Sequence, residues 1–353
     1  MEKSVLHIVF NLNSYSGAAL QANELRKHIN IPSKILSIES TSSRNALNSS
    51  KEDCVQINPK ASLLNYFKIM PEISRYDIVH MHGFSLPAML VAVFLRKKII
   101  LKTTLFGDDD FFSLRKKRFG WLRGVLTRFV KLNIALSEEI FKINKEYINQ
   151  EKIIKIPNGV CLPPGLPGQK SKAIFCTVGV ISPRKGISNT VKYFNEHYAN
   201  LPGAQLYVVG PRPADKDFNL LEGNMQYYNE CLKIAKESPA SVIFTGKLEK
   251  EDLKKIYEES IGFIFFSERE GMPNVLLEAM SYNCVPVTGP ISGAAMEIID
   301  DKKNGFIVHS LNDKVSFEDI TALSESGAPQ KKIAKFFDIK IVAKKYSKIY
   351  ENI

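Results

Sequence analysis

The stretch SEREGMPNVLLEAMSYNCVPVTGPISGAAMEIIDDKKNG, from Ser267 to Gly305, decides the fold of this chain. The apolar run IGFIFF just before it (261–266) is typical of a buried strand in a parallel sheet. The chain then becomes polar and turns, and Pro273 and Asn274 predict the start of a helix, with the proline in its first turn and the asparagine as its N-cap. The stretch therefore predicts a strand, a polar turn and a helix.

Two acidic residues, Glu270 and Glu278, flank this turn, the first on the loop and the second about one turn into the helix. The backbone N–H groups at the start of a helix favour an anion. Carboxylates that accept sugar hydroxyls, placed around an anion site, suit a nucleotide-sugar. The spacing leaves a second interpretation open, in which one acid only complements the helix dipole and the other lies on the surface.

The same stretch resembles a known family. EGMPNVLLEAM (270–280), followed by PV (286–287), a Gly-containing turn (292–294), Glu297 and NGFIV (304–308), is similar to the donor-site signature of retaining glycosyltransferases of family 4, which have the GT-B fold. The resemblance implies that Glu270 contacts the transferred sugar and Glu278 the ribose of the nucleotide. To the same donor site we assign Gly271, Met272, Asn274 and Val275.

Length and pattern predict two domains. A chain of 353 residues with 44% hydrophobic content can bury two ordinary cores. Strands alternate with helices, which predicts an α/β protein with parallel, doubly wound sheets. We expect an acceptor-binding domain over 1–160, a Pro/Gly-rich linker over 161–172 and a donor-binding domain over 173–337, with a last helix at about 338–353 that packs back on the first domain. The resemblance covers most of the chain and implies two Rossmann-like domains facing a cleft.

In the first domain, ligands are expected beyond the carboxyl ends of the strands. This rule places Gly17, His82 and the loop Phe106 to Asp110 on one rim. Gly17 resembles part of the Gly-rich loop that the family has near acceptor and phosphate, although a simple tight turn explains it as well. DIVHMHG (77–83) resembles the family's Asp-x-x-His-x-His segment, so we treat His82 as a candidate catalytic residue; a structural histidine at a strand end is the alternative.

The loop TTLFGDDDFF (103–112) departs from the family. The family has a histidine before the glycine of this loop, and here that position holds Phe106. Three acids follow, and we take Asp109 as the candidate that faces sugar or acceptor. The alternative is a cluster of acids that caps the helix starting at Phe111.

The second domain offers cations for a diphosphate. Gly179 follows a predicted strand, and Arg184 and Lys185 lie in the next strand-to-helix loop, where they can stabilise a departing diphosphate. The family has an arginine directly after the first glycine, and Val180 stands there instead, while Lys185 matches. A solvated basic loop is the alternative.

The net charge of +11 is unevenly distributed. The first 160 residues carry 24 Lys and Arg against 14 Asp and Glu, so nearly all of the excess lies in the first half. Within it, SLRKKRFGWLRGVLTRFVKL (113–132) predicts an amphipathic helix with an apolar face beside cations, suited to an anionic membrane surface. The predicted membrane contacts are Arg115, Lys116, Lys117, Arg118, Trp121 and Arg123. A packed surface helix with a solvated basic edge is the alternative; no nucleic-acid-binding signature accompanies the charge.

The remaining features exclude several classes. No run of 18 apolar residues and no N-terminal leader are present, so we expect a cytoplasmic protein, peripheral on the inner face of the cell membrane. The five cysteines are scattered without a CxxC, which argues against a zinc site or disulfide framework. We expect no bound metal and no cofactor, since the nucleotide-sugar is a substrate.

The combined prediction is a retaining, metal-independent hexosyltransferase of polysaccharide biosynthesis. It moves a sugar from a nucleotide-diphosphate-sugar, expected to be a UDP-sugar, to a cell-surface glycan or lipid-linked acceptor. Two alternatives stay open: a catalytically silent GT-B subunit or binding module, because Phe106 and Val180 depart from the family, and a GT-B nucleotide-sugar epimerase.

Overall fold

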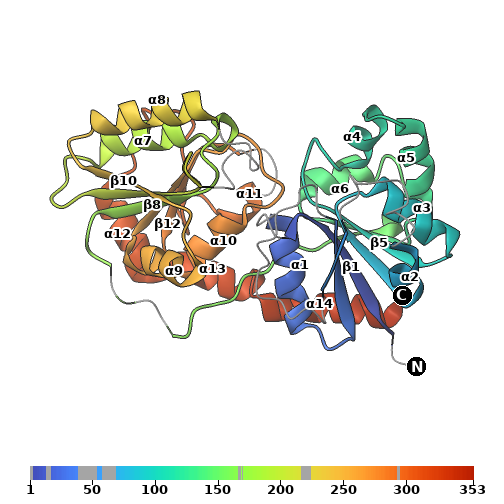
Figure 1. Ribbon diagram of the computed structural model, residues 1–353. Helices are drawn as coiled ribbons and strands as arrows, with labels where there is room; N and C mark the ends of the chain where they lie inside the picture. The colour runs from blue at the N-terminus through green and yellow to red at the C-terminus, as the bar shows by residue number, and fades with distance from the viewer. Residues whose placement is uncertain are drawn as a thin grey trace. The chain divides into compact units, whose positions relative to one another are not determined.

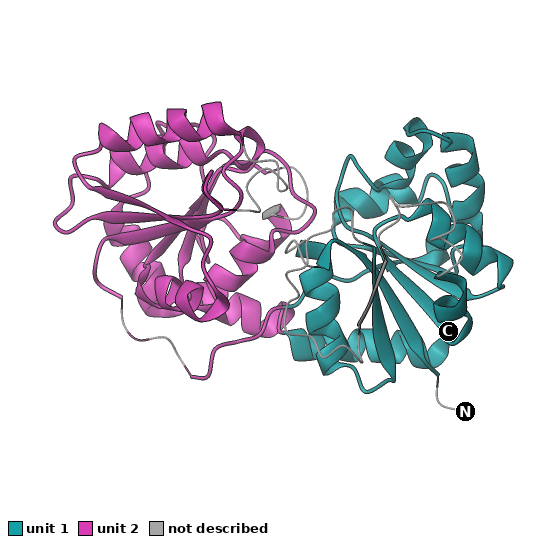
Figure 2. Cartoon of the chain, in the orientation of Figure 1, with its two compact units in different colours: residues 1–159, 339–353 teal, residues 160–338 magenta. Residues whose placement is uncertain are grey.

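The computed structural model describes residues 3–12, 17–38, 54–57, 69–165, 168, 170–215, 224–291 and 295–353. These form two compact units, residues 1–159 with 339–353 and residues 160–338 (Figure 2). The division lies between Gly159 and Val160, next to the predicted end of the first domain at residue 160. The Gly-containing turn at 292–294 falls outside the described residues.

The first unit contains a seven-stranded sheet in the order β3-β2-β1-β4-β5-β6-β7, and every pair is parallel. Its central strands are short apolar runs whose residues are buried on both faces, as expected of a sheet covered by helices on both sides. The strands are β1 (Val5–Phe10), β2 (Ser33–Ile38), β3 (Cys54–Ile57), β4 (Ile78–His82), β5 (Lys98–Thr103), β6 (Leu132–Ala135) and β7 (Ile153–Lys155).

Helices cover both faces of this sheet (Figure 1). They are α1 (Gly17–His28), α2 (Ile69–Ser74), α3 (Leu86–Phe94), α4 (Phe111–Lys116), α5 (Gly120–Leu126), α6 (Glu138–Asn144) and α14 (Ile339–Asn352), with short 3-10 turns η4 (Thr127–Phe129) and η5 (Gln150–Lys152). Because side chains alternate along a strand, Ile78 packs toward α1 and α14, while its neighbour Val79 packs toward α2, α3, α4 and α5.

Polar side chains interrupt the apolar layer under α14. His80 of β4 lies against two tyrosines of this helix, Tyr346 and Tyr350. The Tyr350 hydroxyl lies 2.6 Å from His80 Nδ1, and all three side chains are buried. This hydrogen bond joins residues 270 positions apart in sequence, so it ties the end of the chain into the first unit.

The second unit contains a six-stranded parallel sheet in the order β10-β9-β8-β11-β12-β13. Its strands are β8 (Ile174–Val178), β9 (Gln205–Val209), β10 (Ser241–Gly246), β11 (Gly262–Phe265), β12 (Val285–Thr288) and β13 (Phe306–Ile307). Its helices are η6 (Pro183–Lys185), α7 (Ile187–His197), α8 (Met225–Lys236), α9 (Lys250–Glu259), α10 (Asn274–Ser281), α11 (Ala295–Ile298), α12 (Phe317–Ser326) and α13 (Ala328–Phe336). Both units are thus doubly wound, as the alternating pattern predicted.

The single amphipathic helix predicted over 113–132 is wrong, because the segment folds into α4, α5 and η4. The chain reverses at Phe119, which adopts the left-handed conformation with φ +58°. A Cβ at Gly120 would lie 1.8 Å from the Arg115 carbonyl oxygen, so α5 starts in close contact with α4. Among the described helices, none combines the length and apolar character needed to cross a lipid bilayer.

The two tyrosines of α14 allow a matched test of the polar layer. Tyr350→Phe leaves a buried ring nitrogen of His80 unpaired, and we expect it to lower the free energy of unfolding by about 1–3 kcal/mol. The Tyr346 hydroxyl is buried with no hydrogen-bond partner among the described residues, so Tyr346→Phe is expected to be neutral or stabilising. Urea unfolding followed by circular dichroism measures both; equal losses in the two variants would contradict this assignment.

Candidate functional site

Each sheet has one point where its strand order reverses. In the second unit the chain runs from β8 to β9 and β10 on one side, then returns to place β11 on the other side of β8. In the first unit the same reversal lies between β1 and β4. Loops that leave the carboxyl ends of two such strands diverge and open a crevice, which is the usual place for a ligand in this kind of sheet.

Two loops meet at the reversal in the second unit. The loop after β8 contains Gly179 and η6, and the Lys185 side chain passes the place where a Cβ on Gly179 would lie, 3.7 Å away. Gly186 has φ +63°, and a Cβ there would lie 2.0 Å from the carbonyl oxygen of Phe266, just after β11. Only glycine permits this close approach, which holds the cationic loop against the loop that carries Glu270.

Glu270 lies where these two loops meet. Its Oε1 accepts hydrogen bonds from Lys185 Nζ at 2.5 Å and from Ser267 Oγ at 2.6 Å. Arg184 Nη1 lies 3.8 Å from the same oxygen and donates to the Arg269 carbonyl at 3.2 Å. Glu270 is only 8% exposed, so the two cations compensate a largely buried carboxylate. The structure thus brings together three residues predicted for the donor site, Arg184, Lys185 and Glu270.

The helix after this loop starts differently from the prediction. Pro273 is the N-cap of α10 and Asn274 its first residue, the reverse of the predicted order, and no side chain caps the helix. Proline fits here because it fixes φ and has no N–H to satisfy. Gly271 and Met272 are buried just before the helix, while Asn274 and Val275 are partly exposed on its first turn.

Glu278 lies one turn further along α10 and is partly buried. The Tyr257 hydroxyl of α9 donates to its Oε2 at 3.4 Å. Burial, and then the charge of Glu278, raise the pKa of Tyr257 well above its usual value, so the phenol stays a donor. No described contact joins Glu278 to Glu270.

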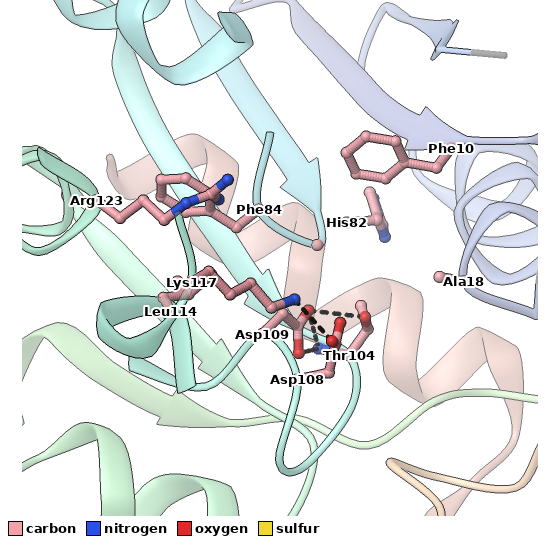
Figure 3. A pocket seen from close by; sticks show the side chains of 11 residues that line it. Phe10, Ala18, His82, Phe84, Thr104, Asp108, Asp109, Leu114, Lys117 and Arg123 are labelled. Carbon is pink, nitrogen blue, oxygen red and sulfur yellow. Dashed lines mark hydrogen bonds and ion pairs between the residues drawn. The ribbon is translucent and has the colours of Figure 1, made fainter. Parts of the chain in front are cut away.

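A cavity of about 280 Å³ lies at the reversal point of the first unit (Figure 3). Two residues predicted for the acceptor side, His82 and Asp109, line it, and Lys117 and Arg123, predicted as membrane contacts, line it as well. The remaining lining residues are Phe10, Ala18, Gly83, Phe84, Thr104, Asp108 and Leu114. Gly17 is the exposed first residue of α1, directly before Ala18.

The three acids of the loop have distinct contacts. Asp110 is the N-cap of α4 and accepts from the Ser113 N–H, so the capping interpretation is confirmed for this residue. Asp108 pairs with Lys117 at 2.6 Å. Asp109 accepts from the Thr104 N–H, from its hydroxyl and from the Leu105 N–H, which fixes its own loop. Burial raises the pKa of Asp109 to about 6 despite these bonds.

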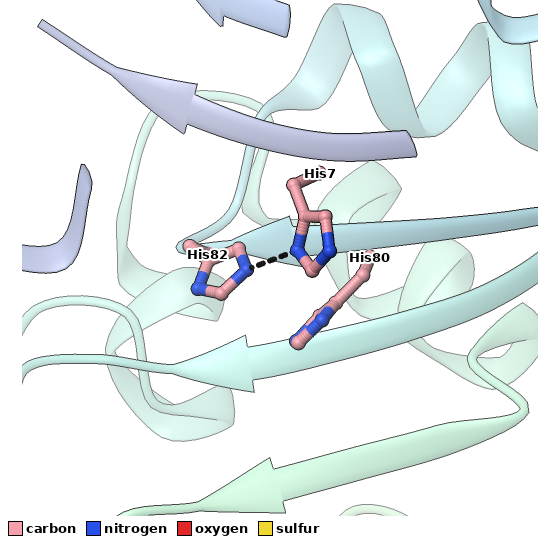
Figure 4. A group of neighbouring side chains, drawn as sticks. All are labelled: His7, His80 and His82. Atoms are coloured by element: carbon pink, nitrogen blue, oxygen red, sulfur yellow. Dashed lines mark hydrogen bonds between the residues drawn. The ribbon is translucent and has the colours of Figure 1, made fainter. Parts of the chain in front are cut away.

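His82 belongs to a buried histidine cluster formed with His7 and His80 (Figure 4). His7 Nδ1 and His82 Nε2 lie 3.0 Å apart. Burial lowers the pKa of His7 to about 3 and the pKa values of the other two well below the usual range, so all three are neutral near pH 7. Beside them Lys102, which donates to Asn158 at 2.7 Å, has its pKa lowered by burial to about 7.

This cluster is the arrangement in the described part of the first unit that most resembles a metal site. One nitrogen from each ring lies within 4.8 Å of the others, and each histidine has one ring nitrogen without a partner among the described residues. However, His7 and His82 are in hydrogen-bond contact with each other, and the Lys102 amine is close enough to lower the pKa of all three rings. These features suit a neutral hydrogen-bonded cluster better than a cation.

Sequence reasoning missed most of this cluster. A usable signal was present, since His80 and His82 are two residues apart on one strand and so face the same side. His7 pairs with His80 across the parallel ladder. The sequence does not show that Lys102 and α14 complete the layer, because these contacts join distant segments.

Residues 164–336 match the family model described as glycosyl transferases group 1. Over 284 residues the chain is 25% identical to the Escherichia coli UDP-Gal:alpha-D-GlcNAc-diphosphoundecaprenol alpha-1,3-galactosyltransferase, covering 74% of this chain and 69% of the relative.

Solved structures share the fold over the whole chain. The apo form of the lipopolysaccharide outer core galactosyltransferase WaaB matches with a TM-score of 0.65 at 18% identity, covering 99% of this chain and 100% of that one. Anabaena HepE in complex with UDP and glucose matches with a TM-score of 0.74 at 15% identity, covering 100% of both chains. The predicted GT-B fold is confirmed.

The buried histidines predict a pH-dependent stability. Their pKa values are depressed in the folded state, so below the unfolded value of 6.5 the unfolded chain binds more protons, and stability is lost as the pH falls toward about 3. Each group contributes a slope of up to about 1.4 kcal/mol per pH unit. Urea unfolding between pH 6.5 and 4.5 measures the slope.

Two variants control this measurement. His7→Leu removes one of the buried titrating groups. We expect it to lower the slope of the unfolding free energy against pH by up to about 1.4 kcal/mol per pH unit, the contribution of one proton. His309→Gln, at an exposed position of the second unit, is expected to leave the slope as it is. A parent slope that survives unchanged in His7→Leu would contradict the assignment.

Proposed function

We propose that this chain, whose residues 164–336 match the family model of glycosyl transferases group 1, is a retaining glycosyltransferase that moves a sugar from a UDP-sugar to a glycan or lipid-linked acceptor. The observation that carries the proposal is the cluster of Lys185, Arg184 and Ser267 around Glu270 at the reversal point of the second sheet.

Glu270 is proposed to hold hydroxyls of the transferred sugar. Its Oε1 accepts two hydrogen bonds from Lys185 and Ser267, and these contacts fix the position of the carboxylate. As the bond from the sugar to the diphosphate breaks, the sugar gains positive charge, and a fixed carboxylate stabilises that charge. Glu278 is proposed to accept the ribose hydroxyls, with the Tyr257 hydroxyl fixing its orientation.

Arg184 and Lys185 are proposed to stabilise the departing diphosphate. Both lie on the loop after β8, and the Lys185 side chain passes beside Gly179. The start of α10, which no side chain caps, adds backbone N–H groups that favour an anion. Two cations and a helix start supply the neutralisation that metal-dependent enzymes obtain from Mg²⁺, and this supports a metal-independent reaction.

One relative and one solved structure support UDP as the nucleotide. The Escherichia coli relative is named for a UDP-Gal donor and a GlcNAc-diphosphoundecaprenol acceptor. The Anabaena structure is described as a complex with UDP and glucose. We propose a UDP-hexose donor for this chain, and an acceptor that is a lipid-linked or cell-surface glycan.

The acceptor is proposed to bind in the cavity of the first unit. His82 and Asp109 line it, and Lys117 and Arg123 give it a cationic side. We propose that the acceptor hydroxyl attacks the anomeric carbon from the face that the diphosphate leaves. The new C–O bond forms as the old one breaks, and the hydroxyl proton passes to the leaving phosphate oxygen, which retains the anomeric configuration. We also propose that the enzyme works in the cytoplasm at the inner face of the cell membrane.

A catalytically silent subunit is the second candidate. Phe106 replaces the histidine that the family has in the loop after β5, and Val180 replaces an arginine after Gly179. Measured turnover of a UDP-sugar decides between the active glycosyltransferase and the silent subunit. An epimerase would instead change the configuration of the donor sugar in the absence of an acceptor.

Replacement of Glu270 tests the donor site. Glu270→Gln keeps the size of the side chain but removes its charge, and we expect kcat to fall by about 10²- to 10³-fold. Glu268→Gln changes an exposed carboxylate on the same loop and is expected to keep parental activity. UDP release is measured with the donor that gives the largest thermal shift in a UDP-sugar panel. Parental turnover in Glu270→Gln would contradict the assigned role, and a parent that is inactive with every donor would favour the silent subunit.

The stereochemistry and metal independence have a separate test. We expect the product formed from an α-linked donor to carry an α-glycosidic bond, seen by proton NMR of the anomeric signal. We expect the rate to be unchanged by excess EDTA, because Arg184 and Lys185 neutralise the diphosphate. A β-linked product, or loss of activity in EDTA that Mg²⁺ restores, would overturn the corresponding part of the proposal.

A further inference from the structure

Large apolar side chains are exposed in one region of the first unit. Of the eleven exposed large hydrophobic residues in the described chain, seven lie between residues 90 and 129. They are Leu90, Phe94, Phe112, Phe119, Trp121, Val125 and Phe129. Two of them are almost fully exposed for such large side chains, Trp121 at 73% and Phe94 at 74%.

These residues lie on neighbouring elements. They come from α3, α4, the turn at Phe119, α5 and η4, and α5 packs against both α3 and α4. Figure 1 shows these helices on the side of the first sheet opposite α14. We call the surface formed by the seven residues the aromatic face. Exposed apolar side chains gathered on neighbouring helices mark an interaction site more often than single scattered ones do.

Cations surround the aromatic face. Residues 84–132 contain eleven Lys and Arg, of which only Lys102 is buried beside the histidine cluster, against three acids, Asp108, Asp109 and Asp110. Two of these acids are buried and the third pairs with Lys117. Lys116 Nζ stands 3.8 Å from the centre of the Phe112 ring, and the Arg118 guanidinium 4.9 Å from that of Phe119. The aromatic rings and the positive charges therefore share one surface.

The turn between α4 and α5 is held in a costly conformation. Phe119 is half exposed and adopts φ +58° and ψ 36°, a region that non-glycine residues rarely occupy. A glycine at this position would adopt the same backbone conformation without strain. The presence of a strained phenylalanine instead is a reason to look for a function of its side chain. What the phenylalanine adds is an aromatic ring at the tip of the aromatic face.

The cavity of the first unit adjoins the same helices. Leu114 and Lys117 at the end of α4 and Arg123 of α5 line it, and the Arg123 guanidinium stands 5.2 Å from the centre of the Phe84 ring (Figure 3). A molecule held at the aromatic face is thus next to the proposed acceptor cavity.

We propose that the aromatic face docks on an anionic lipid bilayer and presents the neighbouring cavity to a membrane-anchored acceptor. Aromatic and aliphatic side chains enter the boundary between headgroups and acyl chains, and the cations contact anionic headgroups. A nucleic acid would use the cations but would leave Phe94, Trp121 and Val125 in water. The statement about the acceptor rests on the proposed function; the docking itself does not.

Vesicle flotation with the full chain tests the docking. We expect the parent protein to float with vesicles containing phosphatidylglycerol and to stay unbound with pure phosphatidylcholine. Trp121→Ser with Phe129→Ser, and Arg118→Ser with Arg128→Ser, are each expected to reduce the bound fraction about tenfold or more. Phe336→Ser with Lys335→Ser removes an exposed aromatic ring and an adjacent cation of the second unit, and is expected to bind like the parent.

One further variant separates docking from damage to the fold. Phe119→Gly removes the ring but suits the left-handed backbone, so we expect an equal or higher melting temperature together with weaker vesicle binding. Parental binding by all aromatic-face variants would overturn the proposal. So would an equal loss of binding in the Phe336 control, or a parent that binds duplex DNA and ignores anionic vesicles.

Donor hydrolysis without vesicles distinguishes failure of this inference from failure of the proposed function. The Trp121/Phe129 and Arg118/Arg128 variants are expected to hydrolyse the UDP-sugar at the parental rate, because these residues lie in the first unit and outside the cavity lining. A parent without any donor turnover would reject the proposed function while flotation still decided the docking. If these variants lose donor hydrolysis to the same extent as they lose vesicle binding, the proposal that the aromatic face acts only in docking would be overturned.

Discussion

The proposed donor site depends on the parallel pairing of β8 with β9 on one edge and with β11 on the other. In this arrangement the loops after β8 and β11 leave adjacent strand ends at the point where the strand order reverses, the usual place for a ligand in such a sheet. The loops then touch at one place, where Gly186 approaches the Phe266 carbonyl so closely that a Cβ cannot fit. Strand order thus determines which charged residues can meet, and Lys185 reaches Glu270 although 85 positions separate them.

The charges of Glu270, Lys185 and Arg184 compensate one another. A carboxylate that is 8% exposed is costly to bury, and Lys185, Ser267 and the more distant Arg184 offset that cost. A bound diphosphate would draw on the same two cations, while sugar hydroxyls would donate to the carboxylate. Compensation of the buried charge and the proposed recognition of the donor therefore use the same atoms.

The sequence predicted the parts of the site that local patterns encode. Strands followed by Gly-containing loops located Gly179, Arg184, Lys185 and Glu270, and the alternating pattern predicted both sheets. The parts that failed depend on competing local geometry or on distant contacts. Asn274 looked like the N-cap of α10, but Pro273 takes that place, and the helix predicted over 113–132 breaks at Phe119 because Gly120 lies directly against α4. The histidine layer was missed because Tyr350, from the other end of the chain, completes it.

The structure also bears on whether α4 and α5 are ordinary surface helices. A helix that covers a sheet needs one apolar side, and these two have it, since Phe111, Leu114 and Leu126 are at most 4% exposed in the core. Phe112 and Trp121 lie outside that buried set and are exposed. A packed surface helix with a solvated basic edge needs only the apolar side that faces the sheet. A second set of exposed apolar side chains adds nothing to the stability of the folded unit, because these side chains are not buried within it. The exposed rings are therefore not the remainder of an incomplete core, and burial against a partner outside the unit is what would make them favourable.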